Sequence, residues 1–78
     1  MSSIDKLPTL AALKRNEKLQ EANGDQMNDF MHKQAAGEKP DPAQFLKMVE
    51  RQMTLHAVAQ AQLKLHEKTL RNAINSAR

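Results

Sequence analysis

The chain has no cysteine at all, and its only aromatic residues are Phe30 and Phe45. Without cysteine no disulfide can staple the fold, and two phenylalanines supply few large side chains for a compact core. A domain of 78 residues usually buries too little apolar surface to be robust without a disulfide, a metal or a partner. The composition therefore favours stabilisation by association with other chains.

Long apolar stretches are also missing. No segment approaches the ~20 apolar residues that span a bilayer, so we expect no membrane insertion. The start, from Met1 to Lys6, has neither the basic region nor the apolar region of a cleaved signal peptide. We expect synthesis in the cytoplasm and, if the protein is secreted to the cell surface, export without a cleaved signal.

Residues with the spacing of an active site are absent too. The run from His66 to Leu70 begins like the helix of a zinc protease, but that motif needs a second histidine where Leu70 stands. The serines lie near the two ends without a neighbouring base, and the glycines form no phosphate-binding loop. We expect no catalytic, cofactor-binding or metal-binding residues, and therefore not an enzyme.

Charge is present but spread out. Residues 1–41 carry six basic and seven acidic side chains, whereas residues 42–78 carry six basic and two acidic ones. The basic residues of the second half do not cluster into one face, as nucleic-acid binding requires. We expect no nucleic-acid partner, which leaves a small basic nucleic-acid-binding regulator as the least favoured alternative.

The most informative feature that is present is a turn made by Pro40, Asp41 and Pro42. Each proline excludes the preceding residue from the α region, so no helix passes through. Gly37 suits the end of one helix, while Asp41 suits the N-cap of the next, with Pro42 at its first position and Gln44 completing a capping-box-like start. The pattern predicts an all-α fold, a two-helix hairpin.

The two halves differ in strength. We expect a flexible lead-in over 1–8, then a helical hairpin over 9–78 with a weak first helix over about 9–36, broken near 23–25 where Gly24 stands between Asn23 and Asp25. The turn occupies 37–41. A long second helix follows over about 42–77, without any glycine or further proline.

The apolar residues of this second helix do not form one stripe. From 55 to 65 they occupy every odd position, which on a helix maps to two separate sectors. One partner helix covers only one sector, so the other sector needs further copies or another protein. The residues that we expect at subunit interfaces are Phe45, Leu46, Val49, Met53, Leu55, Val58, Leu63, Leu65, Leu70 and Ile74.

Several of these features resemble the needle subunits of bacterial type III secretion systems. The matching parts are the Pro40-Asp41-Pro42 turn, the apolar start at Ala43-Gln44-Phe45-Leu46, the pair Asn28-Asp29 and the ending Asn72-Ala73-Ile74-Asn75-Ser76-Ala77-Arg78. The turn is one residue shorter than the family's, and no aromatic residue follows Phe45, where the family commonly has some. The inner-rod subunit of the same apparatus has a similar C-terminal helix and is not separated from the needle by these residues.

The resemblance implies a structural protein of the virulence apparatus, a homo-oligomer that forms a hollow helical filament for unfolded exported proteins. It also implies cytoplasmic chaperones before export and contacts with other proteins of the apparatus. With the C-terminal helix lining the channel, a wet and weakly adhesive wall would contain Gln52, Gln60, Gln62, Lys64, Asn72 and Asn75. The alternative from a different class is a small cytoplasmic helical adaptor or chaperone that holds one partner helix.

Overall fold

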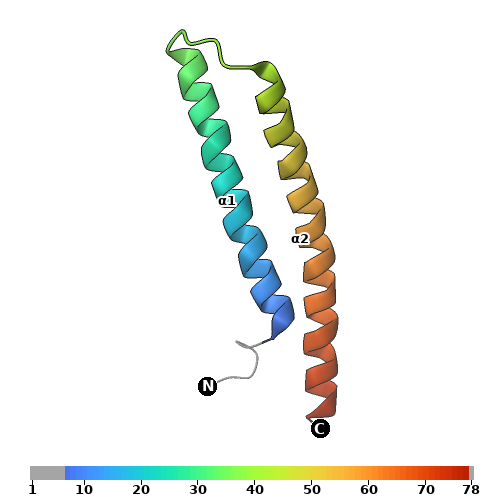
Figure 1. Cartoon of the computed structure of the whole chain (residues 1–78). Helices are drawn as coiled ribbons and strands as arrows, with labels where there is room; N and C mark the ends of the chain where they lie inside the picture. Colours follow the sequence, from blue (N-terminus) through green and yellow to red (C-terminus); the bar gives the residue numbers. More distant parts are fainter. Residues whose placement is uncertain (1–6, 78) are drawn as a thin grey trace.

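The computed structural model describes residues 7–77 and has two helices, α1 (Pro8–Ala35) and α2 (Pro42–Ser76). They lie antiparallel and side by side as a hairpin of 62 × 23 × 13 Å (Figure 1). The predicted all-α hairpin with a longer C-terminal helix is confirmed. Most of the predicted lead-in falls on residues 1–6, which lie outside the described residues.

The turn is built by the residues that the sequence indicates. Gly37 has a φ of 87°, a left-handed conformation that glycine adopts without strain, and the N–H of Glu38 donates to the Lys33 carbonyl at 3.0 Å, as in a Schellman motif. Asp41 caps α2, since its Oδ1 accepts from the N–H of Ala43 at 3.0 Å. Within residues 7–77 no bond returns from the Gln44 side chain to Asp41, so the capping box is one-sided.

The break that we expected near 23–25 is absent, because α1 continues through Asn23, Gly24 and Asp25. Asn23 is only 2% exposed, and its Nδ2 donates to the Met48 carbonyl at 2.9 Å and to Gln52 Oε1 at 3.0 Å. Those bonds to α2 hold the helical backbone in place. A hydrogen bond contributes about 0.5–1.5 kcal/mol to stability, which is comparable to the cost of about 1 kcal/mol that glycine carries in a helix interior.

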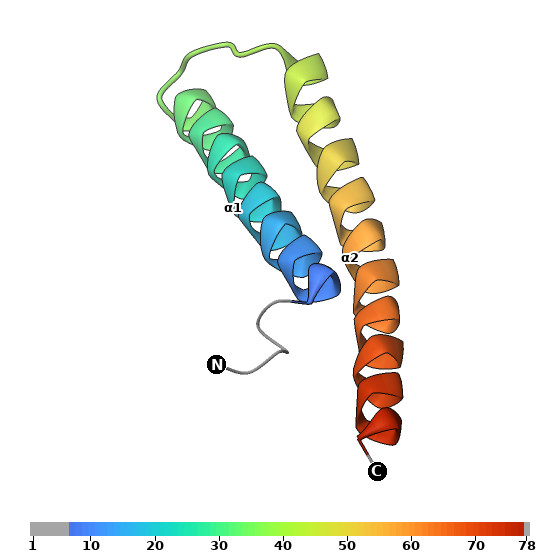
Figure 2. The same cartoon turned by 60° about the horizontal axis from the view of Figure 1, so that its bottom comes forward.

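The second helix is the longer one and extends past the first residues of α1 (Figure 2). Thr9, in the first turn of α1, contacts His66 of α2. Residues 71–77 follow that contact and are all exposed. We refer to residues 71–77 as the C-terminal overhang.

Candidate interaction surfaces

The side chains between the helices form a continuous seam with alternating steps of three and four residues, the spacing of a coiled coil. All of them are buried or half-buried. On α1 the seam contains Thr9, Leu13, Asn16, Gln20, Asn23, Met27 and Phe30, and on α2 it contains Phe45, Met48, Gln52, Leu55, Ala59, Gln62, His66 and Thr69.

The contacts across the seam keep one register along its whole length. Phe30 meets Phe45 with ring centroids 5.0 Å apart, and one heptad further along both helices Asn23 donates to Gln52. Two heptads beyond that pair, Thr9 Oγ1 and His66 Nδ1 lie 2.7 Å apart in a hydrogen bond. The two helices therefore pair without a slip from the turn to the open end.

Much of the seam is polar. Asn16 is 4% exposed and its Nδ2 donates to the Leu55 carbonyl at 3.0 Å, while Gln52 Nε2 donates to Gln20 Oε1 at 3.4 Å. Phe30 is the one buried apolar residue among residues 7–77. The seam therefore resembles a ladder of amides closed by an aromatic pair at the turn.

Two acceptors in this ladder have no partner within residues 7–77. They are Oδ1 of Asn23 and Oε1 of Gln62, both buried. A buried polar group without a hydrogen bond costs about 1–3 kcal/mol. The seam therefore selects one alignment of the helices at the expense of the stability that an apolar seam would provide.

The ten residues that we expected at subunit interfaces divide into two groups. Phe45 and Leu55 belong to the seam and face α1, and Val49 and Leu70 are half-buried beside it. Phe45 and Leu55 therefore make their apolar contacts within the chain and not with another subunit. Leu55 is among the predicted residues because the odd-numbered apolar pattern from 55 to 65 contains part of the seam. The other six are exposed, from 42% to 67%: Leu46, Met53, Val58, Leu63, Leu65 and Ile74.

The exposed apolar residues lie on both sides of the hairpin. Gln26 and Gln44 line a hollow beside the turn. Val58 and Leu65 lie two and three heptads after Gln44, and Leu19 lies one heptad before Gln26, so these three residues flank the same side of the seam as the hollow. We call this side the hollow face. The opposite face carries Leu46, Met53, Leu63 and Ile74 from α2 and Met31 from α1.

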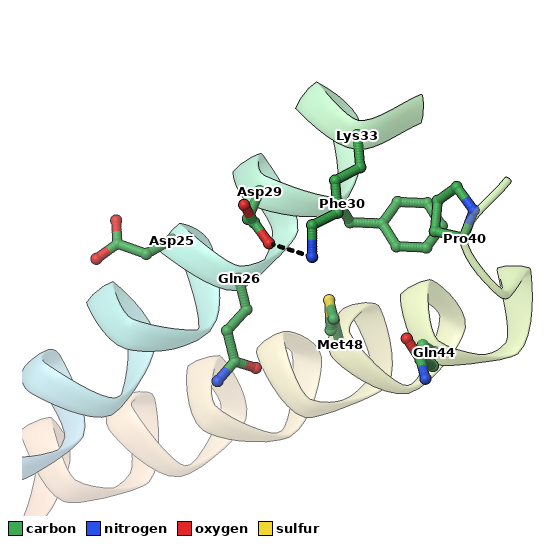
Figure 3. Close-up of a pocket in the computed structure, with 8 residues that line it drawn as sticks. All are labelled: Asp25, Gln26, Asp29, Phe30, Lys33, Pro40, Gln44 and Met48. Carbon is green, nitrogen blue, oxygen red and sulfur yellow. Dashed lines mark ion pairs between the residues drawn. The ribbon is translucent and has the colours of Figure 1, made fainter. Parts of the chain in front are cut away.

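A hollow of about 370 Å³ lies on the hollow face beside the turn (Figure 3). Phe30, Pro40 and Met48 supply its apolar lining, and Asp25 and Asp29 stand on its α1 side. The polar residues Gln26, Lys33 and Gln44 complete the lining.

The rim of this hollow is acidic on balance. Lys33 Nζ lies 3.2 Å from Asp29 Oδ2, and this is the one ion pair in the described part of the chain. Asp25 has no basic partner there. The hollow therefore combines an apolar lining with an unpaired carboxylate at its edge.

The residues that the resemblance places on a channel wall are separated by the fold. Gln52 and Gln62 belong to the seam and face α1. Gln60, Lys64, Asn72 and Asn75 are exposed, and Gln60 also bonds to His56 over 3.3 Å. Only these four are accessible while the hairpin is closed.

Sequence reasoning missed the polar seam, although its signal was present in the spacing. The steps of three and four from Phe45 to Thr69 are regular, but Gln52, Gln62 and His66 interrupt the apolar pattern that identifies such a seam.

Residues 7–77 contain no helix with the length and apolarity needed to cross a membrane. The same residues bring no three His, Asp or Glu side chains together at metal-binding distance. Comparison with protein-family models, curated proteins and solved structures found no match for this chain.

Proposed function

We propose that this protein is a structural subunit that associates with further copies through the exposed apolar residues of α2. The observation that carries the proposal is the distribution of polar and apolar side chains over α2. Four of the eight seam positions of α2 are polar, among them His66, whereas six large apolar side chains of α2 face outward on both sides of the hairpin. Exposed apolar side chains in such number are typical of surfaces that bind other proteins.

The dimensions of the hairpin support a large contact. Each broad face measures about 62 by 23 Å. A standard protein interface buries about 800 Å² on each partner, which such a face can provide. Because apolar residues occur on both faces, one copy can bind two neighbours, which is the requirement for a polymer.

The kind of polymer that we propose is the needle filament of a type III secretion system, a conduit for unfolded exported proteins. The support is the resemblance of the Pro40-Asp41-Pro42 turn and of the residues from Asn72 onward, together with the hairpin that such a turn produces. The exposed side chains of Gln60, Lys64, Asn72 and Asn75 are polar groups of the kind that a channel wall needs.

The first test is the assembly of the purified chain. We expect light scattering to rise with concentration and electron microscopy to show hollow filaments. Val58→Asp and Leu63→Asp should each abolish filaments, because a charge replaces an apolar side chain in the contact. Both residues are more than 40% exposed, so the monomer should stay folded and soluble.

Ala57→Asp is the matched control, since it adds the same charge to an exposed position beside Val58 that carries no large apolar side chain. Filaments of normal length from Val58→Asp would contradict the assignment of the contacts. A defined dimer or a 1:1 complex at every concentration would instead support the helical adaptor. Solid filaments without a channel would contradict the role as a conduit.

A further inference from the structure

Within residues 7–77, no hydrogen bond or ion pair joins a side chain of the C-terminal overhang to the rest of the hairpin. Residues 71–77 are exposed, and Ile74 is 63% exposed. Arg71 stands three residues before Ile74, and Lys68 three residues before Arg71, so the three side chains lie next to one another on the helix surface. The overhang, together with the last helical turn of α2 before it, therefore presents an apolar side chain beside two positive charges.

The hollow at the turn presents the complementary features. Phe30, Pro40 and Met48 line it, and Asp25 lies at its outer edge without an ion pair in the described residues, with its carboxylate directed away from the apolar lining (Figure 3). An apolar side chain that enters the lining leaves water, while an adjacent cation gains a carboxylate partner. The hollow thus fits a helix that carries an apolar residue beside a basic one.

The two features lie at opposite ends of one molecule. The hollow is at the turn, and the overhang is at the far end of a hairpin 62 Å long (Figure 1). One chain therefore cannot bring its own overhang to its own hollow. A contact between them must join two copies.

We infer that the C-terminal overhang of one copy docks in the hollow beside the turn of the next copy, with Ile74 against the apolar lining and Arg71 beside Asp25. This inference rests on the proposed function, because it names the end-to-end contact of the polymer. The two surfaces differ, so the contact is head-to-tail. Such a contact extends into an open chain when its rotation does not close a ring.

The test exchanges the two charges. Arg71→Glu and Asp25→Lys should each raise the critical concentration for assembly about tenfold, because like charges then face each other in the contact. The double variant restores opposite charges and should return to within about twofold of the original protein. Circular dichroism should give the same helix content for all four proteins.

The chain offers a matched control for each variant. Arg15→Glu makes the same charge change as Arg71→Glu at an exposed position of α1, outside both the overhang and the hollow. Glu21→Lys makes the change of Asp25→Lys one turn earlier in α1, outside the hollow. Both controls should assemble at the original concentration.

A second measurement locates the contact directly, since the chain has no cysteine of its own. Gln26→Cys labels the hollow and Asn75→Cys labels the overhang. Mixed under oxidising conditions, these variants should give mainly the disulfide-linked pair of unlike chains, whereas Lys64→Cys mixed with Gln26→Cys should not.

Three results separate this inference from the function on which it rests. If the original protein forms filaments but the double charge variant keeps the raised critical concentration of the single variants, the docking alone is overturned. A mass of two chains that does not grow with concentration would show a closed pair and overturn the open chain. An original protein that never associates, and gives no unlike cross-link, would overturn both.

Discussion

The inner side of α2 is half polar, while its outer sides carry six exposed large apolar residues, which departs from the usual distribution of polarity. On the inner side His66 is buried and Gln52 is hydrogen-bonded across the seam, whereas on the outer side Met53 is 67% exposed and Ile74 is 63% exposed. A helix pair stabilised by its own core would place these residues the other way round. The comparison teaches that amides align the two helices while most of the large apolar side chains of α2 remain available for other contacts.

The strongest way to break this arrangement is to remove Phe30, the single buried apolar residue in the described part of the chain. Phe30→Ala should lower the free energy of unfolding by about 3 kcal/mol, because it deletes the ring that packs on Phe45 and leaves a cavity. Urea unfolding followed by circular dichroism measures the change, with Val58→Asp included to keep the chain monomeric. Met31→Ala, at the exposed neighbouring position, should change the same quantity by less than about 0.5 kcal/mol. Equal losses for the two variants would contradict the placement of Phe30.

The seam can also be made more like an ordinary core. Gln62→Leu removes the buried Oε1 that accepts no bond in the described structure and should raise the free energy of unfolding by about 1–2 kcal/mol. Gln60→Leu, two residues away on the exposed side, should leave it within about 0.5 kcal/mol. Thermal unfolding of both variants in the monomeric background separates them. A destabilising Gln62→Leu would mean that the amide makes a favourable contact.

The two glycines give the smallest and most local comparison. Gly24→Ala should stabilise the hairpin by about 1 kcal/mol, since the position is helical and an added Cβ meets nothing within 4 Å. Gly37→Ala should destabilise it by about 1 kcal/mol, because the φ of 87° strains any other residue. Helix content and unfolding midpoints of the pair check both signs. Destabilisation by Gly24→Ala would contradict the helical conformation of Gly24 and support the predicted break in α1.

The local features of the fold were predictable and the distant ones were not. Pro40, Asp41 and Pro42 act on their own neighbours, so the turn, the cap and the two helices follow from short-range rules. The continuity of α1 depends on bonds from Asn23 to residues of α2, which no local rule contains. For the same reason an amide such as Gln62, which looks like a surface or channel residue in the sequence, lies in the seam.

The amide seam also affects whether folding of the single chain or assembly of several chains depends more strongly on temperature. Folding of the hairpin removes little apolar surface from water, because only Phe30 among residues 7–77 is both apolar and buried, and the other apolar seam residues are half-buried. Heat-capacity changes follow apolar surface, so folding of the single chain carries a small one. In the assembly that we propose, burial of the outer apolar side chains of α2 supplies most of the heat-capacity change. Cooling weakens apolar contacts more than hydrogen bonds, so such filaments shed intact hairpins in the cold.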